Sequence, residues 1–158
     1  MSIQLLKPIS GRFCQIIPCK MKTEPLTRQQ KVIRLHLAKV AAKRSVVNYT
    51  DLCKDCRLPY TMDNPDHRAK LGHDLGAISE QEVVDFERPM LSSVTVSFIG
   101  GEMRPGRGFF NLAEDLYDYD NEEEFFYSEM TDTHNFWSSS EGRKEILKFE
   151  KELSKCLL

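Results

Sequence analysis

The sequence lacks the hydrophobic features of a membrane or secreted protein. No run approaches the ~20 apolar residues that a helix needs to cross a bilayer. The first 20 residues are interrupted by Lys7, Pro8 and Arg12, and they have no continuous apolar core followed by a small-residue cleavage site. The chain holds five cysteines, an odd number that argues against a set of paired disulfides. These absences predict a cytoplasmic protein with reduced thiols and no membrane partner.

Sequence patterns of known catalytic sites are missing as well. Ser92 and Ser93 lie outside any G-x-S-x-G motif, and there is no H-E-x-x-H pattern. The glycines of "GGEMRPGRG" are not followed by the Lys-Ser/Thr of a phosphate-binding loop. We therefore favour a protein without catalytic activity. The alternative is a small hydrolase or nuclease assembled in space from Glu87, Arg88, Ser92, His67 and the acidic segment, with Arg88, Ser92 and His67 meeting in one cleft.

Four of the cysteines are spaced in a way that raises the question of zinc. Cys14 and Cys19 form a C-x4-C pair and Cys53 and Cys56 form a C-x2-C pair, and four thiolates would suit a tetrahedral zinc ion. However, Cys53 occupies an apolar position of an amphipathic helix, and small buried cysteines are common in cores. We predict neither a metal nor a cofactor, and zinc stays the alternative.

The length and the charge pattern indicate one domain with a polarised surface. A chain of 158 residues buries roughly 68 to 70% of its unfolded surface in a single core. We predict one globular domain over residues 25–158, preceded by a flexible lead over residues 1–24. Residues 20–57 hold 10 Lys/Arg against 3 Asp/Glu, whereas residues 111–132 hold 9 Asp/Glu and no Lys/Arg. The basic part indicates an acidic partner, and the acidic part is either a solvated surface or an internal competitor for that partner.

Helical signals dominate the first half of this domain. Thr27 and Gln30 fit a capping box, which predicts a helix over residues 28–43, and Asn48 is a candidate N-cap for a second helix. Asn64 and the following proline predict a third helix over residues 65–77, whose mid-helix Gly72 indicates close packing against a neighbour. A second capping box at Ser79 predicts a short fourth helix that reaches Phe86.

Strand and turn signals follow in the second half. Residues 90–98 alternate with the period of a half-buried strand, and Gly100-Gly101 begins a turn, with a return strand over residues 108–110. Asn111 then caps one helix, and Ser138 with Glu141 caps a final amphipathic helix. The fold prediction is α+β and mostly helical: a winged-helix-like three-helix unit, a β-hairpin and C-terminal helices. The predicted core includes Leu71, Leu75, Val94, Val96 and Phe109.

Three helices followed by a strand and a glycine-rich loop are typical of a winged helix, which places a recognition helix in a nucleic-acid groove and a wing on the backbone. The predicted binding residues are His67, Arg68 and Lys70 on the third helix and Arg104 and Arg107 in the loop. Proline and glycine in "MRPGRG" let the backbone approach a phosphate, to which arginine donates. We predict a non-catalytic nucleic-acid-binding protein, with DNA as the favoured ligand.

Two resemblances bear on this prediction. "VNYTDLC", the turn containing "LPY", and "HRAKLG" resemble the winged-helix domain of alkylguanine alkyltransferases and alkyltransferase-like proteins. The resemblance covers about 50 of the 158 residues and implies that Arg68 takes the place of that domain's DNA-contacting arginine, with Tyr49 as the matching tyrosine. The P-C-H-R nucleophile motif is replaced by "RPMLSSV", so alkyl transfer is not implied. Separately, "RPMLSSVTV" with "PGRGFF" is similar to a pattern of uncharacterised bacterial proteins, which implies a common fold but no activity.

The runner-up prediction is a protein-interaction module. The segment 114–130 interleaves acidic and aromatic residues, and such a surface docks a basic partner. The same aromatics can instead join the core as one face of a helix, together with Phe136 and Trp137.

Overall fold

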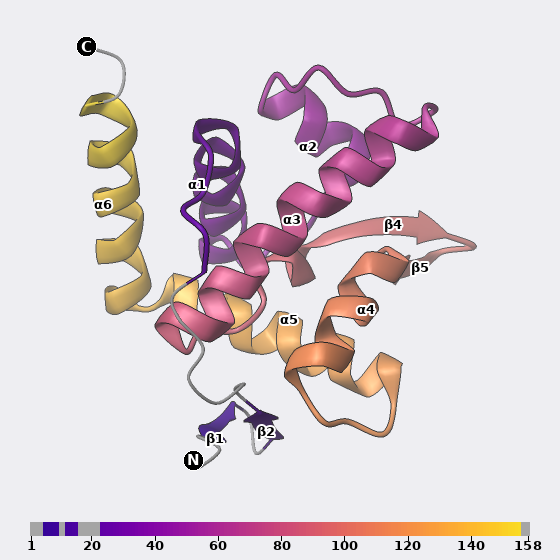
Figure 1. Cartoon of the computed structure of the whole chain (residues 1–158), viewed down its shortest axis with the longest axis vertical. Helices are drawn as coiled ribbons and strands as arrows, with labels where there is room; N and C mark the ends of the chain where they lie inside the picture. Colours follow the sequence, from indigo (N-terminus) through magenta and orange to yellow (C-terminus); the bar gives the residue numbers. More distant parts are fainter. Residues whose placement is uncertain (1–4, 10–11, 16–22, 156–158) are drawn as a thin grey trace.

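The structure is a computed structural model that describes residues 5–9, 12–15 and 23–155 (Figure 1). Its fold is α+β and mostly helical, as predicted. Two strands at the N-terminus, β1 (Leu5–Ile9) and β2 (Arg12–Gln15), pair antiparallel. The remaining elements in chain order are α1 (Arg28–Ala42), β3 (Val47–Asn48), α2 (Tyr49–Asp55), α3 (Pro65–Phe86), a 3-10 turn η1 (Leu91–Val94), β4 (Thr95–Ile99), β5 (Glu102–Arg104), α4 (Arg107–Leu116), α5 (Glu122–Ser138) and α6 (Ser140–Lys155).

The flexible lead predicted over residues 1–24 lies in part outside the described residues. Where the description resumes, Thr23 donates to both carboxylate oxygens of Asp85, from its backbone N at 3.0 Å and from Oγ1 at 2.7 Å. This pair of hydrogen bonds fastens the chain before α1 to the last turn of α3.

Local capping explains where the first three helices begin. Thr27 and Gln30 form the predicted reciprocal capping box at α1, and the Asn48 side chain accepts from the backbone N of Asp51 at α2. Asn64 caps α3 and is followed by Pro65, a residue that suits the first helical turn because its missing N–H would have had no partner there. These three predictions are confirmed.

Helix α3 does not end at Ala77, so the prediction of a separate fourth helix is wrong. Ser79 does not cap a helix, because its hydroxyl accepts from Ser92 N at 2.9 Å and donates to Ser92 Oγ at 2.7 Å. The Glu82 carboxylate accepts two hydrogen bonds from Arg88 instead of reaching back to the Ser79 backbone. The S-x-x-E pattern therefore serves tertiary contacts in the middle of a 22-residue helix.

The hairpin turn is confirmed, but the return strand is β5 rather than residues 108–110. Gly100 and Gly101 have φ angles of +59° and +82°, which side chains rarely adopt and which suit a two-residue turn. The chain after Pro105 is helical because Phe109, Ala113 and Leu116 recur at spacings of four and three and are all buried. Helix α4 therefore begins at Arg107 with Gly106 as its N-cap, and the prediction of an Asn111 cap is wrong.

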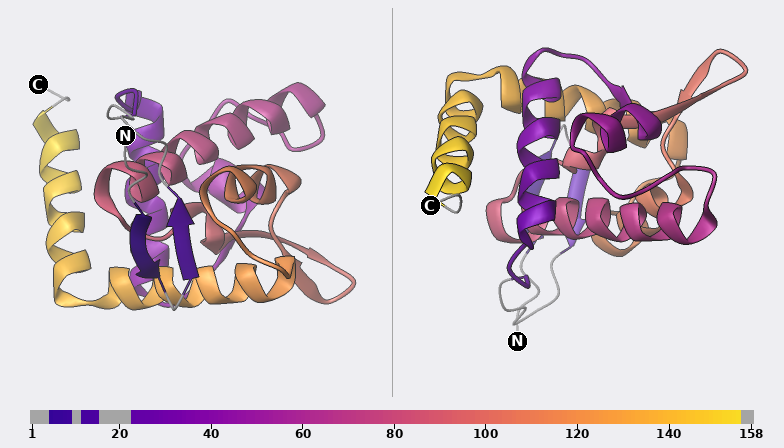
Figure 2. Two further views of the ribbon diagram at one scale, coloured as in Figure 1. Left: turned by 60° about the horizontal axis from the view of Figure 1, so that its bottom comes forward. Right: turned by 90° about the horizontal axis from the view of Figure 1, so that it is seen from above.

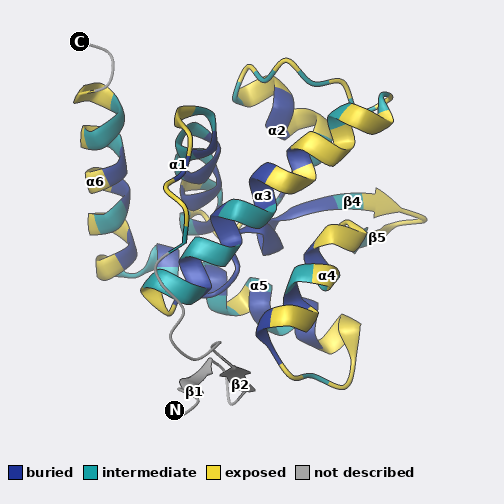
Figure 3. Cartoon of the chain, in the orientation of Figure 1, coloured by how far each residue is buried: buried dark blue, intermediate teal, exposed yellow. Residues whose placement is uncertain are grey.

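The short sheet has the order β3-β4-β5, with β3 parallel to β4 and β4 antiparallel to β5. The five residues predicted for the core are all buried. The apolar alternation predicts burial of Phe98 near the end of β4, but Phe98 is 58% exposed. The outer part of the strand leaves the body of the molecule (Figure 3). Burial along β4 therefore falls from the sheet toward the hairpin tip.

The C-terminal helices close the core around α1. Helix α1 packs against both α5 and α6, and it lies in the angle that these two helices form (Figure 2). Trp137, which is fully buried, contacts Phe136 and Phe149 at this corner. The prediction that Trp137 belongs to the core is confirmed.

One buried ion pair supports the same corner. The fully buried Glu82 accepts from Arg88 Nε at 2.6 Å and from Arg88 Nη2 at 3.1 Å, and the Arg88 guanidinium lies 4.3 Å from the Phe86 ring centroid. Burial raises the pKa of Glu82, and the charge of Arg88 opposes that rise. Arg88 also lies 3.3 Å from Glu145, which ties α6 to the end of α3.

Candidate functional site

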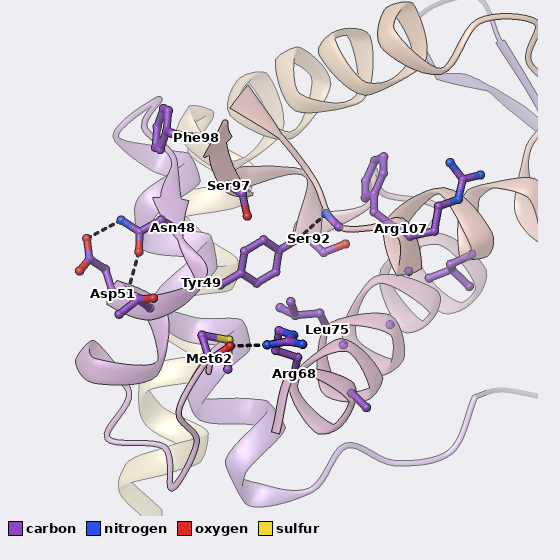
Figure 4. Close-up of a pocket in the computed structure, with 18 residues that line it drawn as sticks. Asn48, Tyr49, Asp51, Met62, Arg68, Leu75, Ser92, Ser97, Phe98 and Arg107 are labelled. Carbon is purple, nitrogen blue, oxygen red and sulfur yellow. Dashed lines mark hydrogen bonds between the residues drawn. The ribbon is translucent and has the colours of Figure 1, made fainter. Parts of the chain in front are cut away.

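A cavity of about 880 Å³ opens between α2, α3, β4 and α4 (Figure 4). This volume is in the range of small-ligand sites. We call it the central pocket, and its lining residues are Asn48, Tyr49, Thr50, Asp51, Met62, Arg68, Ala69, Gly72, Leu75, Gly76, Ser92, Ser97, Phe98, Gly106, Arg107, Gly108, Phe109 and Leu112.

The wall contributed by α3 is flat because three small residues share one helical face. Ala69, Gly72 and Gly76 follow one another at spacings of three and four. A Cβ atom added at Gly72 or at Gly76 would meet no atom within 4 Å. The prediction that Gly72 packs closely against a neighbour is therefore wrong, since this glycine faces open space. The small residues leave the backbone of α3 accessible to whatever enters the pocket.

Tyr49 forms the aromatic side of the pocket and connects two elements. It is the first residue of α2, and its hydroxyl accepts from the backbone N of Gly106 at 2.6 Å, at the start of α4. Burial raises the pKa of Tyr49 above its ordinary value, so the phenol stays protonated at neutral pH. The ring is thus held between the α3 wall and the beginning of α4 (Figure 4).

Arg68 lies at the mouth of the pocket in the first turns of α3. Its Nη1 donates to the carbonyl oxygen of Met62 at 2.7 Å, and its side chain is otherwise exposed. A guanidinium has five N–H donors, so this one bond positions the side chain and leaves donors for a ligand. Arg68 is not part of any ion pair among the described residues.

The two loop arginines are engaged by glutamates. Arg107 lies 3.2 Å from Glu114 and 2.9 Å from Glu122, and Arg104 lies 2.9 Å from Glu102. Glutamates of the acidic segment therefore already occupy Arg107, one of the residues predicted to bind phosphate. In Figure 4 the Arg107 guanidinium points away from Tyr49, although the residue lines the pocket.

The structure separates the five predicted binding residues. Arg68 and Arg107 line the central pocket, and Arg107 with Arg104 also lines a second cavity beside α5. His67 supports the turn before α3, since its Nδ1 accepts from Thr61 N at 3.0 Å. Lys70 is exposed, and because it is two residues beyond Arg68 it lies about 200° further around the helix. Neither His67 nor Lys70 lines these two cavities.

Arg88, Ser92 and His67, the residues of the enzyme alternative, have separate hydrogen-bond partners. Arg88 binds Glu82, Ser92 binds Ser79, and His67 binds Thr61. His67 and Ser79 are twelve residues apart on α3, which is about 18 Å along a helix. The lining of the central pocket contains serines but no histidine or cysteine, so its serines have no histidine base within that lining.

The cysteines with described side chains do not form a metal site. Cys53 is buried in α2, and burial raises the pKa of the half-buried Cys56 thiol to about 12. Such thiols remain protonated at neutral pH and are weak metal ligands. No group of three or more metal-ligating side chains occurs in the part of the chain that the structure describes. The side chains of Cys14 and Cys19 lie outside it.

Several pocket residues were not anticipated from the sequence. Gly76, Met62 and Ser97 come from different segments, and only their folded positions unite them. A signal for the α3 wall is present in the A-x-x-G-x-x-x-G spacing, which places three small residues on one helical face.

No model of a protein family matches the chain, and neither a curated protein nor a solved structure matches it. Among the helices that the structure describes, none is long and apolar enough to cross a membrane.

Proposed function

We propose that this protein binds nucleic acid without catalysing a reaction, and that one unstacked nucleotide enters the central pocket. One observation carries the proposal: the pocket combines a flat helical wall, an aromatic ring and an arginine with uncommitted donors. These are the features that bind a planar base and its phosphate.

The base would lie against the α3 wall. Nucleobases are flat, and a wall without side chains beyond Cβ admits a flat group to van der Waals contact. Leu75, Phe109 and Leu112 give apolar contacts, and Tyr49 offers an aromatic surface. Ser97 borders the pocket, and its hydroxyl can hydrogen-bond to a base edge.

The phosphate would bind Arg68. Its guanidinium is planar, always charged and suited to two parallel hydrogen bonds to phosphate oxygens. The hydrogen bond to Met62 holds the Arg68 side chain at the pocket mouth in the free protein. The side chain therefore loses less conformational entropy when the ligand binds.

The winged-helix interpretation belongs to this proposal. The order α1, β3, α2, α3 and a hairpin supports it, and in this interpretation α3 would be the recognition helix. Arg104 of the hairpin and Arg107 of α4 contribute little to phosphate binding in this proposal, because glutamates already neutralise them. With Arg68 as the phosphate ligand at the pocket, the slope of log binding constant against log salt is about −0.9 for duplex DNA, a quarter of the value of about −3.6 for four cations.

Fluorescence anisotropy with labelled short oligonucleotides tests the proposal. The probes are perfect duplex DNA, the same duplex with one unpaired base, single-stranded DNA and RNA, each titrated at low salt and at raised salt. We expect the unpaired-base duplex and single strands to bind at least about tenfold more tightly than the perfect duplex, because extruding a paired base costs a few kcal/mol.

Matched variants assign the binding to the pocket. Gly72→Leu places a side chain in the cavity and should abolish the preference for unpaired bases, whereas His73→Leu adds the same side chain at the next helical position, outside the lining. Arg68→Ala should weaken every probe. Arg143→Ala is its control, because Arg143 is also exposed and also donates to one backbone carbonyl, that of Ser138. The proposal would be overturned if the folded protein bound none of the probes, or if Gly72→Leu left the preference for unpaired bases unchanged.

A further inference from the structure

The β4–β5 hairpin projects from the body of the molecule (Figures 1 and 2). It carries two exposed apolar side chains. Phe98 is 58% exposed and Ile99 is 65% exposed. As consecutive residues of a strand, they point to opposite sides. In Figure 4, Phe98 points away from Tyr49 while Ser97 points toward it. Phe98 thus borders the central pocket, but its ring points away from the Tyr49 side of that pocket.

One edge of β4 lacks a neighbouring strand over its outer half. β3 pairs only with Thr95 and Val96, whereas β4 continues for three further residues. The residues that flank the two-residue turn, Ile99 and Glu102, form a hydrogen-bonded pair between β4 and β5. Hydrogen-bonded and non-hydrogen-bonded pairs alternate along antiparallel strands, so the backbone N–H and C=O of Phe98 point away from β5, toward the open edge of β4. Such an edge is a template for an added strand.

A cavity of about 630 Å³ lies beside this open edge. We call it the edge cavity, and it is lined by His36, Val40, Val46, Val47, Asn48, Asp51, Lys54, Asp55 and Phe98. Its apolar part is formed by three valines and Phe98. Its charged part contains two carboxylates and one lysine, with Asp51 accepting from Asn48 Nδ2 at 2.8 Å and Asp55 lying 3.2 Å from His36 Nε2.

We propose that an extended segment of a partner protein, with apolar and basic residues in alternation, adds to the open edge of β4. The Phe98 backbone would exchange main-chain hydrogen bonds with it. Apolar side chains of the segment would pack on Phe98 and Val46, and its Lys or Arg side chains would approach Asp51 and Asp55. This charge complementarity selects a basic segment over an acidic one. The inference does not depend on nucleic-acid binding.

Synthetic peptides of defined pattern test the inference. A short alternating Val-Lys peptide is compared with an alternating Val-Glu peptide and with a Val-Lys peptide of the same composition in two blocks. Two exposed ion pairs contribute about 1 kcal/mol together, so we expect the Val-Lys peptide to bind at least about fivefold more tightly than Val-Glu. The amide hydrogen of Phe98 should become protected from exchange when the alternating peptide binds.

Variants distinguish this site from the central pocket. Phe98→Ser and Asp55→Asn should each weaken the alternating peptide, whereas Ile99→Ser, on the other face, and Gly72→Leu should not. Phe98 borders both cavities, but Asp55 lines the edge cavity and not the central pocket, so Asp55→Asn assigns the binding to the edge. The inference would be overturned by any of three results: no binding at about 1 mM peptide, equal binding of the Val-Glu or block peptide, or a Phe98 amide that is not protected from exchange. Self-association of the free protein that Phe98→Ser abolishes would also overturn it, because a second copy would then occupy the edge.

Discussion

Substitution of Gly72 by alanine should stabilise this protein, which is unusual for a change in the lining of a functional site. The Cβ atom would meet no atom within 4 Å, and Gly72 lies inside α3. Alanine is about 0.8 to 1.0 kcal/mol more favourable than glycine in a helix interior. In a chain of 158 residues, a gain of about 1 kcal/mol raises Tm by about 2 to 4 °C.

Gly142 provides the contrasting control in another helix. A Cβ atom there would overlap the carbonyl oxygen of Phe136 and come within 2.6 Å of the Trp137 Cα atom. Both are backbone atoms at the α5–α6 corner, so they cannot rotate away as a side chain would. We expect Gly142→Ala to cost about 1 to 3 kcal/mol, the usual cost of overpacking.

Urea denaturation and thermal melts of the two alanine variants measure both effects. The reasoning requires shifts of opposite sign with an unchanged urea m-value, since the surface exposed on unfolding is the same. A destabilised Gly72→Ala would show that α3 is packed against a neighbour at this position. The central pocket would then not have the open wall on which the nucleotide proposal depends.

Three further predictions concern ionisable groups. Glu82→Gln leaves the buried Arg88 with the partly exposed Glu145 in place of its buried opposite charge, and we expect the free energy of unfolding to fall by about 3 kcal/mol in urea titrations; a loss below about 0.5 kcal/mol would contradict the pairing. A hydrogen bond from Lys31 lowers the pKa of Glu152, so its stabilising effect is present above about pH 4.3 and is lost as the pH falls through the lower folded-state value; Glu152→Gln should reduce that acid-induced loss. Because burial raises the pKa of Cys56 to about 12, iodoacetamide at pH 8 should label it much more slowly in native than in unfolded protein, as mass spectrometry would show.

The starts of α1, α2 and α3 could be predicted because their signals are local. Thr27, Asn48 and Asn64 each accept a hydrogen bond from a backbone N–H two or three residues further along. The predicted Ser138 cap of the last helix is wrong, since Ser138 ends α5 and the Ser139 hydroxyl accepts from Gly142 N at 3.2 Å. The same logic failed at Ser79, where the pattern is identical but the partner of the hydroxyl is Ser92, thirteen residues away. A capping pattern inside a long apolar-periodic stretch therefore cannot distinguish a new helix from a tertiary contact.

The candidate site could be predicted only in part. Arg68 and Tyr49 stood out individually, but the cavity between them depends on α4, which was expected to begin later in the chain. Counting charges along the sequence revealed an acidic segment over residues 111–132. It could not show that Glu122 lies beside Arg107, because Glu122 is on α5 and Arg107 is on α4, and the two meet only in the folded chain.

This neutralisation leads to a last prediction about affinity. Arg107 borders the central pocket, yet its guanidinium is engaged by Glu114 and Glu122, and these hydrogen bonds and charges raise its pKa. Replacing both glutamates by glutamine removes the competing charges and frees the guanidinium for phosphate. If nucleic acid binds at this pocket, the Glu114→Gln/Glu122→Gln variant should bind more tightly than the native protein. Its salt slope should steepen by about 0.9, the contribution of one additional phosphate contact on duplex DNA. Asp115→Asn/Glu124→Gln makes the same change in net charge elsewhere in the acidic segment. An equal gain in that control would mean that net charge alone, and not release of Arg107, controls the affinity.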